Sequence, residues 1–97
     1  MKYYLSIDVG TTNWKAAVYN ETGKLIVIER TPTQTHTDAD GYSIYKPDDM
    51  WNEVCKLCRN VTAKSAVEIA GVSVTSIAEA VVPIDKNGKP AGDIITW

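Results

Sequence analysis

A carboxylate, a glycine, two hydroxyls and an amide stand close together near the start of this 97-residue chain, and a lysine follows them. Gly and Asn tolerate unusual backbone angles, while Thr hydroxyls and turn amides are small hydrogen-bond donors. Such groups can bind the terminal phosphates of a nucleotide, and a neighbouring carboxylate can bind hydrated Mg²⁺ directly or through water. The sequence therefore predicts a loop for the terminal phosphates of a nucleotide, with Asp8 as the metal ligand and Gly10, Thr11, Thr12, Asn13 and Lys15 around the phosphates.

An alternative to the phosphate loop stays open, and so does an alternative role for Lys15. An ordinary hairpin with a Gly-Thr turn and no ligand would have the same local pattern. Lys15 either neutralises phosphate charge or lies on the exposed face of a strand. Asp8 favours a function, because a carboxylate at the end of an apolar strand needs a compensating partner.

Apolar runs on both sides of the loop predict the strands that position it. Residues 3–7 are rich in β-formers, and residues 14–19 alternate in part. A tight turn at 20–23, with Gly23 expected at positive φ, leads to a third β-run over 24–31. Because both connections are short, we expect these strands to form an antiparallel meander.

The next part of the chain predicts a loop and then a helix. Residues 32–46 carry no helical period and are expected to form a surface loop. A Pro and two acidic residues at 47–49 are typical of a first helical turn, and the helix should run to about Ala66. Its apolar stripe is Met50, Val54, Leu57, Val61 and Ala66, widened by Trp51, Cys55 and Cys58. Trp51 is expected in the core, and Tyr42, Ile44 and Tyr45 are candidate anchors of the loop.

Two further β-segments complete the pattern. Residues 72–75 alternate as a short strand, which should run parallel to the first strand after a right-handed crossover through the helix. Residues 81–85 and 93–97 read as the arms of a hairpin with a Lys-Asn-Gly tip. An antiparallel meander, a helix and a parallel strand together predict an α/β fold, the first part of an RNase H-like domain.

Composition excludes several classes of function. Twelve acidic and ten scattered basic residues give a net charge of −2, which does not favour nucleic acid or an anionic membrane as a partner. No apolar run approaches a membrane span, and the start lacks the features of a signal peptide. We therefore expect a cytoplasmic protein with no membrane association.

Cys55 and Cys58 have the spacing of a redox motif or of half a zinc site. A zinc site normally needs four ligands, and the single histidine, His36, stands in a polar loop. Both cysteines fall within the predicted helix, so we interpret them as small apolar residues on one helix face.

The segment Asp8-Val9-Gly10-Thr11-Thr12-Asn13-Trp14-Lys15 resembles the first phosphate motif, D-x-G-T-T-x-x-K, of the superfamily of sugar kinases, actin and chaperone ATPases. The form is closest to the FGGY carbohydrate kinases, among them the xylulose and glycerol kinases. The acidic turn before Trp51 and the hairpin near the end resemble the same family, so the likeness extends over the whole chain. It implies an actin-like ATPase subdomain, ATP and Mg²⁺ as cofactors, and a sugar or polyol substrate.

Ala78 and Glu79 match by position a pair that binds substrate in this family. Glycerol kinases have an Arg-Glu pair there, and xylulose kinases a Met-His pair, so neither pattern is reproduced. A carboxylate can accept hydrogen bonds from two polyol hydroxyls. The alternative is that Glu79 is a solvated hairpin residue.

The resemblance also implies what these residues lack. The general base of such kinases is an aspartate far downstream, so no catalytic residue is assigned within residues 1–97. We expect the chain to be the N-terminal part of the first kinase domain, with the second domain absent. Alone it should be inactive and prone to self-association, whereas the complete protein should form a homodimer. A non-kinase ATPase switch and a purely structural or binding domain remain the alternatives.

Overall fold

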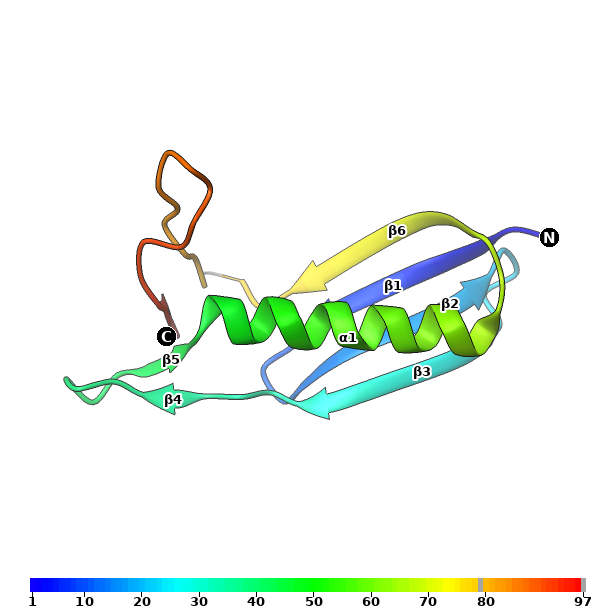
Figure 1. Ribbon diagram of the computed structural model, residues 1–97. Coiled ribbons are helices and arrows are strands. Elements are labelled where there is room, and N and C mark those ends of the chain that lie inside the picture. The colour runs from blue at the N-terminus through cyan, green and yellow to red at the C-terminus, as the bar shows by residue number, and fades with distance from the viewer. Residues whose placement is uncertain (79, 97) are drawn as a thin grey trace.

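A computed structural model describes residues 1–78 and 80–96 of the chain (Figure 1). The main sheet has the strand order β3-β2-β1-β6, with β1 and β2 antiparallel, β2 and β3 antiparallel, and β6 parallel to β1. This confirms the α/β class, the meander and the parallel crossover strand. The elements of this layer are β1 (Tyr3–Val9), β2 (Asn13–Asn20), β3 (Leu25–Pro32), α1 (Pro47–Ser65) and β6 (Ile69–Ser76).

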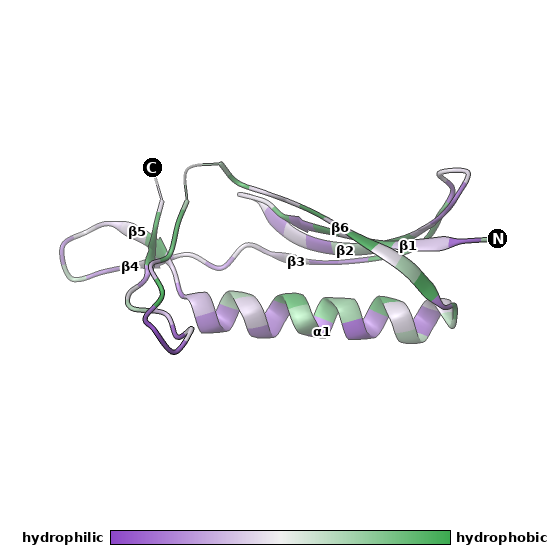
Figure 2. Cartoon of the chain, turned by 90° about the horizontal axis from the view of Figure 1, so that it is seen from above, coloured by the Kyte–Doolittle hydropathy of each residue, from purple (hydrophilic) through white to green (hydrophobic). Residues whose placement is uncertain are grey.

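The core lies between α1 and one face of this sheet, and the view from above shows the helix lying along that face (Figure 2). Alternate residues of β1 and β2 point toward the helix, since Leu5 pairs with Val18 and both are buried. Burying a side chain of this size contributes about 2 kcal/mol. The buried cluster is Leu5, Trp14, Ala16, Val18, Leu57 and Val61.

The predicted limits of the helix are confirmed. Pro47 stands in its first turn, where a missing N–H costs nothing, and Asp48 and Asp49 complement the positive end of the helix dipole. At the other end Ala66 adopts the left-handed conformation, φ 53°, and its N–H donates to the carbonyl of Thr62. Ala66 is therefore the cap that ends the helix, and it is exposed rather than part of the apolar stripe.

The prediction that Trp51 lies in the core is wrong, because its side chain is 68% exposed. Met50 packs against the core, and the next residue along a helix is rotated about 100° from it. Trp51 therefore lies at the edge of the buried face of α1. There it lines an open apolar recess together with Val54 and Val74.

Residues 32–46 contain a short hairpin instead of an irregular loop. It is formed by β4 (His36–Thr37) and β5 (Ser43–Tyr45), and Asp38 closes the turn by accepting hydrogen bonds from the N–H groups of Asp40 and Tyr42. Ile44 and Tyr45 are buried, as expected of anchors, and burial raises the pKa of Tyr45. Tyr42 is more than half exposed and anchors nothing.

The predicted hairpin over 81–97 is also mostly wrong. The predicted Lys-Asn-Gly tip is present, with Gly88 at φ 78°, but no bridge joins the two predicted arms within the described residues. One bridge links Ile84 to Pro90, which precedes the second arm. The strand β7 (Ile94–Ile95) pairs instead with β5, so β4, β5 and β7 form a small second sheet. The buried Tyr45 is the register partner of Ile94, and this long-range pairing prevails over the local one. Trp97 lies outside the described residues.

Within the described residues, no helix is long and apolar enough to cross a membrane. The cysteines are free thiols on α1. Cys58 packs against the core, and burial raises the pKa of its thiol. Across residues 1–78 and 80–96, no three metal-binding side chains gather in one place.

Candidate functional site

The predicted phosphate loop connects β1 to β2 at one end of the central strand. Val9 pairs with Trp14, so the chain reverses direction over residues 10–13, and the N–H of Gly10 donates to the carbonyl of Asn13 at 3.0 Å. A Cβ atom on Gly10 would lie 2.9 Å from that carbonyl oxygen. Glycine is therefore required here by the close approach of the two backbone segments.

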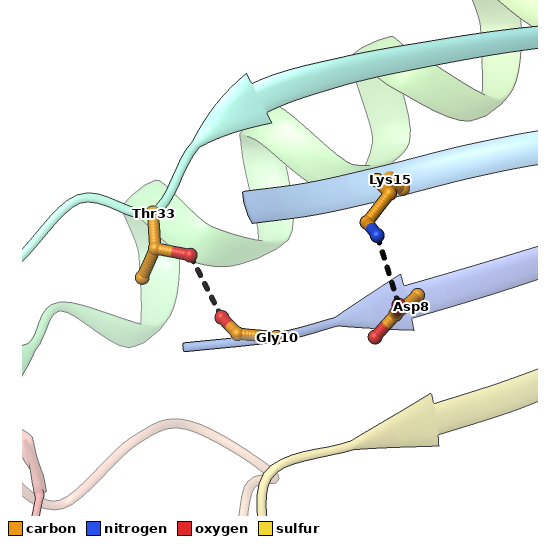
Figure 3. A network of polar contacts seen from close by, with 4 residues as sticks. All are labelled: Asp8, Gly10, Lys15 and Thr33. Atoms are coloured by element: carbon orange, nitrogen blue, oxygen red, sulfur yellow. Dashed lines mark hydrogen bonds and ion pairs between the residues drawn. The ribbon is translucent and has the colours of Figure 1, made fainter. Parts of the chain in front are cut away.

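Asp8 and Lys15 are register partners on β1 and β2, and their side chains point toward one another (Figure 3). Asp8 Oδ2 and Lys15 Nζ are 3.6 Å apart, and both side chains are about one-third exposed. A pair this exposed contributes little to stability, about 0–1 kcal/mol. The pair can therefore separate at a small cost in free energy, which would let Asp8 bind a metal ion and Lys15 bind a phosphate.

All six predicted residues of the phosphate loop line one recess of about 210 Å³: Asp8, Gly10, Thr11, Thr12, Asn13 and Lys15. Thr11 and Thr12 are exposed, and their backbone N–H groups donate no hydrogen bond to any residue in the described ranges. The recess thus combines free amides, hydroxyls, an ammonium group and a carboxylate. These are the groups that bind phosphate and its cation, and their role as such stays a prediction.

Thr33 is a neighbour of the loop that sequence reasoning missed. Its hydroxyl donates to the carbonyl of Gly10 at 2.7 Å (Figure 3). Its N–H donates to the carbonyl of Thr12 at 3.0 Å. The pairing of β2 with β3, in which Asn13 faces Pro32, brings Thr33 there. Only the register of those strands could have indicated this contact.

The predicted substrate turn begins beside the phosphate loop. The N–H of Ile77 donates to the carbonyl of Val9 at 3.1 Å, so the ladder between β1 and β6 extends one residue past the end of β6. Ligand sites of α/β proteins are found at such carboxyl ends of parallel strands. Ala78 is exposed at this edge, and Glu79 lies outside the described residues.

Two other recesses differ in character. The one beside α1 is almost entirely apolar, with lining residues such as Ile7, Val54 and Val74, and offers nothing to a phosphate. The one at the start of α1 is lined by Lys46, Asp48, Asp49 and Asp93, among others. Its carboxylates would repel an anion, whereas the recess at the end of β1 has an ammonium group, hydroxyls and free amides for a phosphate.

These features define an α/β domain in which groups able to bind phosphate gather in the loop after β1. Comparison with known proteins agrees. The sequence profile described as the FGGY family of carbohydrate kinases, N-terminal domain, matches residues 3–97. The chain belongs to the FGGY family of carbohydrate kinases, as the phosphate motif predicted.

Curated relatives carry the names of kinases. The chain is 31% identical over 100 residues to a glycerol kinase of Bacillus licheniformis, covering 99% of this chain and 20% of that protein. It is 30% identical over 95 residues to a probable L-xylulose kinase of Pasteurella multocida, covering 95% of this chain and 20% of that protein. The chain therefore spans about a fifth of the length of these relatives.

Solved structures share the fold. A gluconate kinase from Lactobacillus acidophilus superposes with a TM-score of 0.88 at 24% identity, covering 99% of this chain and 20% of that one. Plasmodium falciparum glycerol kinase with ADP gives 0.87 at 22% identity, with 100% and 20% coverage. At these identities the likeness shows the mixed α/β architecture alone.

Proposed function

We propose that this chain is the N-terminal part of the first domain of an ATP-dependent carbohydrate kinase, with an RNase H-like, actin-like ATPase fold. The observation that carries the proposal is the recess at the end of β1, which all six predicted residues line. Membership of the FGGY family and the relatives named glycerol and xylulose kinase support it.

The groups of the recess fit the triphosphate of ATP and its magnesium ion. The carboxylate of Asp8 is a hard oxygen ligand of the kind Mg²⁺ prefers, and it is accessible. Bound there, Mg²⁺ would neutralise phosphate charge. The free N–H groups of Thr11 and Thr12 and the ammonium group of Lys15 orient the phosphate oxygens by hydrogen bonds and charge.

A sugar or polyol hydroxyl is the acceptor of the phosphoryl group in this proposal. Ile77 precedes the predicted substrate residues Ala78 and Glu79 in the sequence, and its N–H donates to Val9 beside the loop. An acceptor bound next to Ile77 would meet the phosphate at one edge of the sheet. The general base is assigned to no residue in 1–97, and we expect these residues alone to catalyse nothing. Catalysis would rest on positioning and charge stabilisation, as in phosphoryl transfer generally.

The test is ADP formation by the protein expressed from its complete coding sequence, with Mg·ATP and a panel of pentuloses, hexuloses, pentitols and glycerol. A single strong responder that is lost on Asp8→Ala, and kept in the exposed-carboxylate control Asp40→Ala, would support the kinase and name its substrate. Slow ADP formation without dependence on any sugar would favour the ATPase switch. Activity unchanged by Asp8→Ala would refute the role of the loop.

A further inference from the structure

The loop has two sides, and the hydrogen bonds on its second side come from one residue. Thr33 follows directly after β3 and is partly buried, and it does not line the recess. Its hydroxyl binds the carbonyl of Gly10, and its N–H binds the carbonyl of Thr12. Thr33 therefore holds two of the three residues that connect β1 to β2.

These bonds fix the direction of the loop's amide groups. The peptide bonds here are trans, and in a trans peptide the carbonyl and the following N–H point in opposite directions. Because the carbonyl of Gly10 points to Thr33, the N–H of Thr11 must point away from it. The bond to the carbonyl of Thr12 restricts the peptide between Thr12 and Asn13 in the same way.

The free N–H of Thr11 needs such a constraint. Thr11 and Thr12 are exposed, and their own amides donate to no described residue, so little else on the recess side restrains them. An unrestrained turn can rotate a peptide plane and turn a carbonyl oxygen toward the ligand. A carbonyl in that position would repel a phosphate oxygen, because both are acceptors.

We propose that Thr33 is a positioning residue of the phosphate loop, which presets the amide of Thr11 toward nucleotide phosphates by holding the carbonyl of Gly10. The inference rests on the proposed function, since it assigns phosphates to the same recess. Thr33 acts through the loop and touches no reacting atom. Preorganised donors bind a ligand more tightly because less ordering remains to be done on binding.

The test compares Thr33→Val, Thr33→Ser and Thr35→Val in the protein from its complete coding sequence. Valine keeps the shape and the N–H of Thr33 but removes the hydroxyl donor, and serine restores it. Thr35 is exposed and its hydroxyl binds no residue of the described chain, so Thr35→Val controls for the exchange itself. Affinity for Mg·ADP and the KM values for ATP and for the acceptor sugar are measured for each.

We expect Thr33→Val to weaken Mg·ADP binding and raise the KM for ATP about three- to tenfold, the value of one lost hydrogen bond. The KM for the acceptor should not change, and Thr33→Ser and Thr35→Val should resemble the wild type. Unchanged Mg·ADP affinity in Thr33→Val, or equal losses toward nucleotide and acceptor, would overturn the role of Thr33 alone. A wild-type protein that binds no Mg·ADP would overturn the proposed function, and this inference with it.

Discussion

Gly10 has no room for a side chain. In Gly10→Ala the new Cβ would lie 2.9 Å from the carbonyl oxygen of Asn13, so the backbone of the loop must shift. Overpacking of this kind costs about 1–3 kcal/mol. We expect a loss of that size in the free energy of unfolding, measured by urea titration.

Gly92→Ala is the matched control for Gly10→Ala. A Cβ on Gly92 meets no atom within 4 Å, and Gly92 is not among the glycines at positive φ. The free energy of unfolding of this variant should differ from that of the wild type by no more than about 0.5 kcal/mol, as is usual for exposed substitutions. Equal stability of both variants would show that the carbonyl oxygen of Asn13 leaves room for a Cβ atom on Gly10.

The site residues differ in how far sequence could predict them. Asp8, Gly10 and Lys15 are close in the chain, so a short motif brings them together whatever the rest of the fold does. Thr33 is 23 residues from Gly10, and only the register of β2 and β3 joins them. Glu79 lies outside the described residues, so its predicted contact with substrate remains untested.

The helix α1 is tied to the sheet by an ion pair that predicts a pH effect. Lys64, in the last turn of α1, donates a hydrogen bond to Glu29 of β3, and this bond holds the pKa of the Glu29 carboxyl below its ordinary value. A lowered folded-state pKa stabilises the protein above the unfolded pKa, and the stabilisation is lost as pH falls through the folded value. The wild type should lose this contribution as the pH falls below the ordinary pKa of a glutamate carboxyl.

Lys64→Met tests the pair because it removes the ammonium group and keeps an apolar stem. Urea unfolding at pH 7 and pH 3 should show a smaller loss of stability on acidification in Lys64→Met than in the wild type. Lys86→Met, in an exposed turn, should keep the wild-type difference. The same difference in all three proteins would mean that the pair between helix and sheet has no effect in solution.

The elements that sequence predicted well are those with strong local signals. The β-forming runs at β1 to β3, and the Pro and acidic residues in the first turn of α1, form the predicted elements in the structure because tertiary packing agrees with these local preferences. The prediction of a hairpin over residues 81–97 was wrong because β7 pairs with β5, about fifty residues away in the sequence. No local pattern encodes that pairing. The prediction that Trp51 is buried was wrong because Trp51 follows directly after Met50, which packs against the core. Adjacent residues of a helix point in different directions, so the side chain of Trp51 lies on the open side of α1.

One edge and part of one face of the molecule are uncovered in the described chain. The helix α1 lies over β1, β2 and β3, while Val72 and Val74 of the edge strand β6 are 60% and 65% exposed. The sequence of β6, Ile69–Ser76, contains no charge and no proline, the usual protections of an edge strand. We expect the 97-residue chain to self-associate through β6 as its concentration rises.

Val74→Lys should weaken this association, because a charge on an edge strand opposes pairing with a second copy. Sedimentation velocity over a range of concentrations should show a rising mean mass for the wild type and a nearly constant one for the variant. Tyr42→Lys, on the exposed turn of the small sheet, should behave as the wild type. A sharp, concentration-independent monomer in the wild type would contradict the expectation.

The recess at the end of β1 is proposed to bind a magnesium nucleotide through Asp8. Calorimetric titration of the protein from its complete coding sequence with Mg·ATP tests this binding, using wild type, Asp8→Asn and the exposed control Asp40→Asn. Asn keeps the size of the side chain and removes its charge, so Asp8→Asn should weaken binding about tenfold or more, while Asp40→Asn should not. Equal affinity in all three proteins, or none in the wild type, would contradict the account.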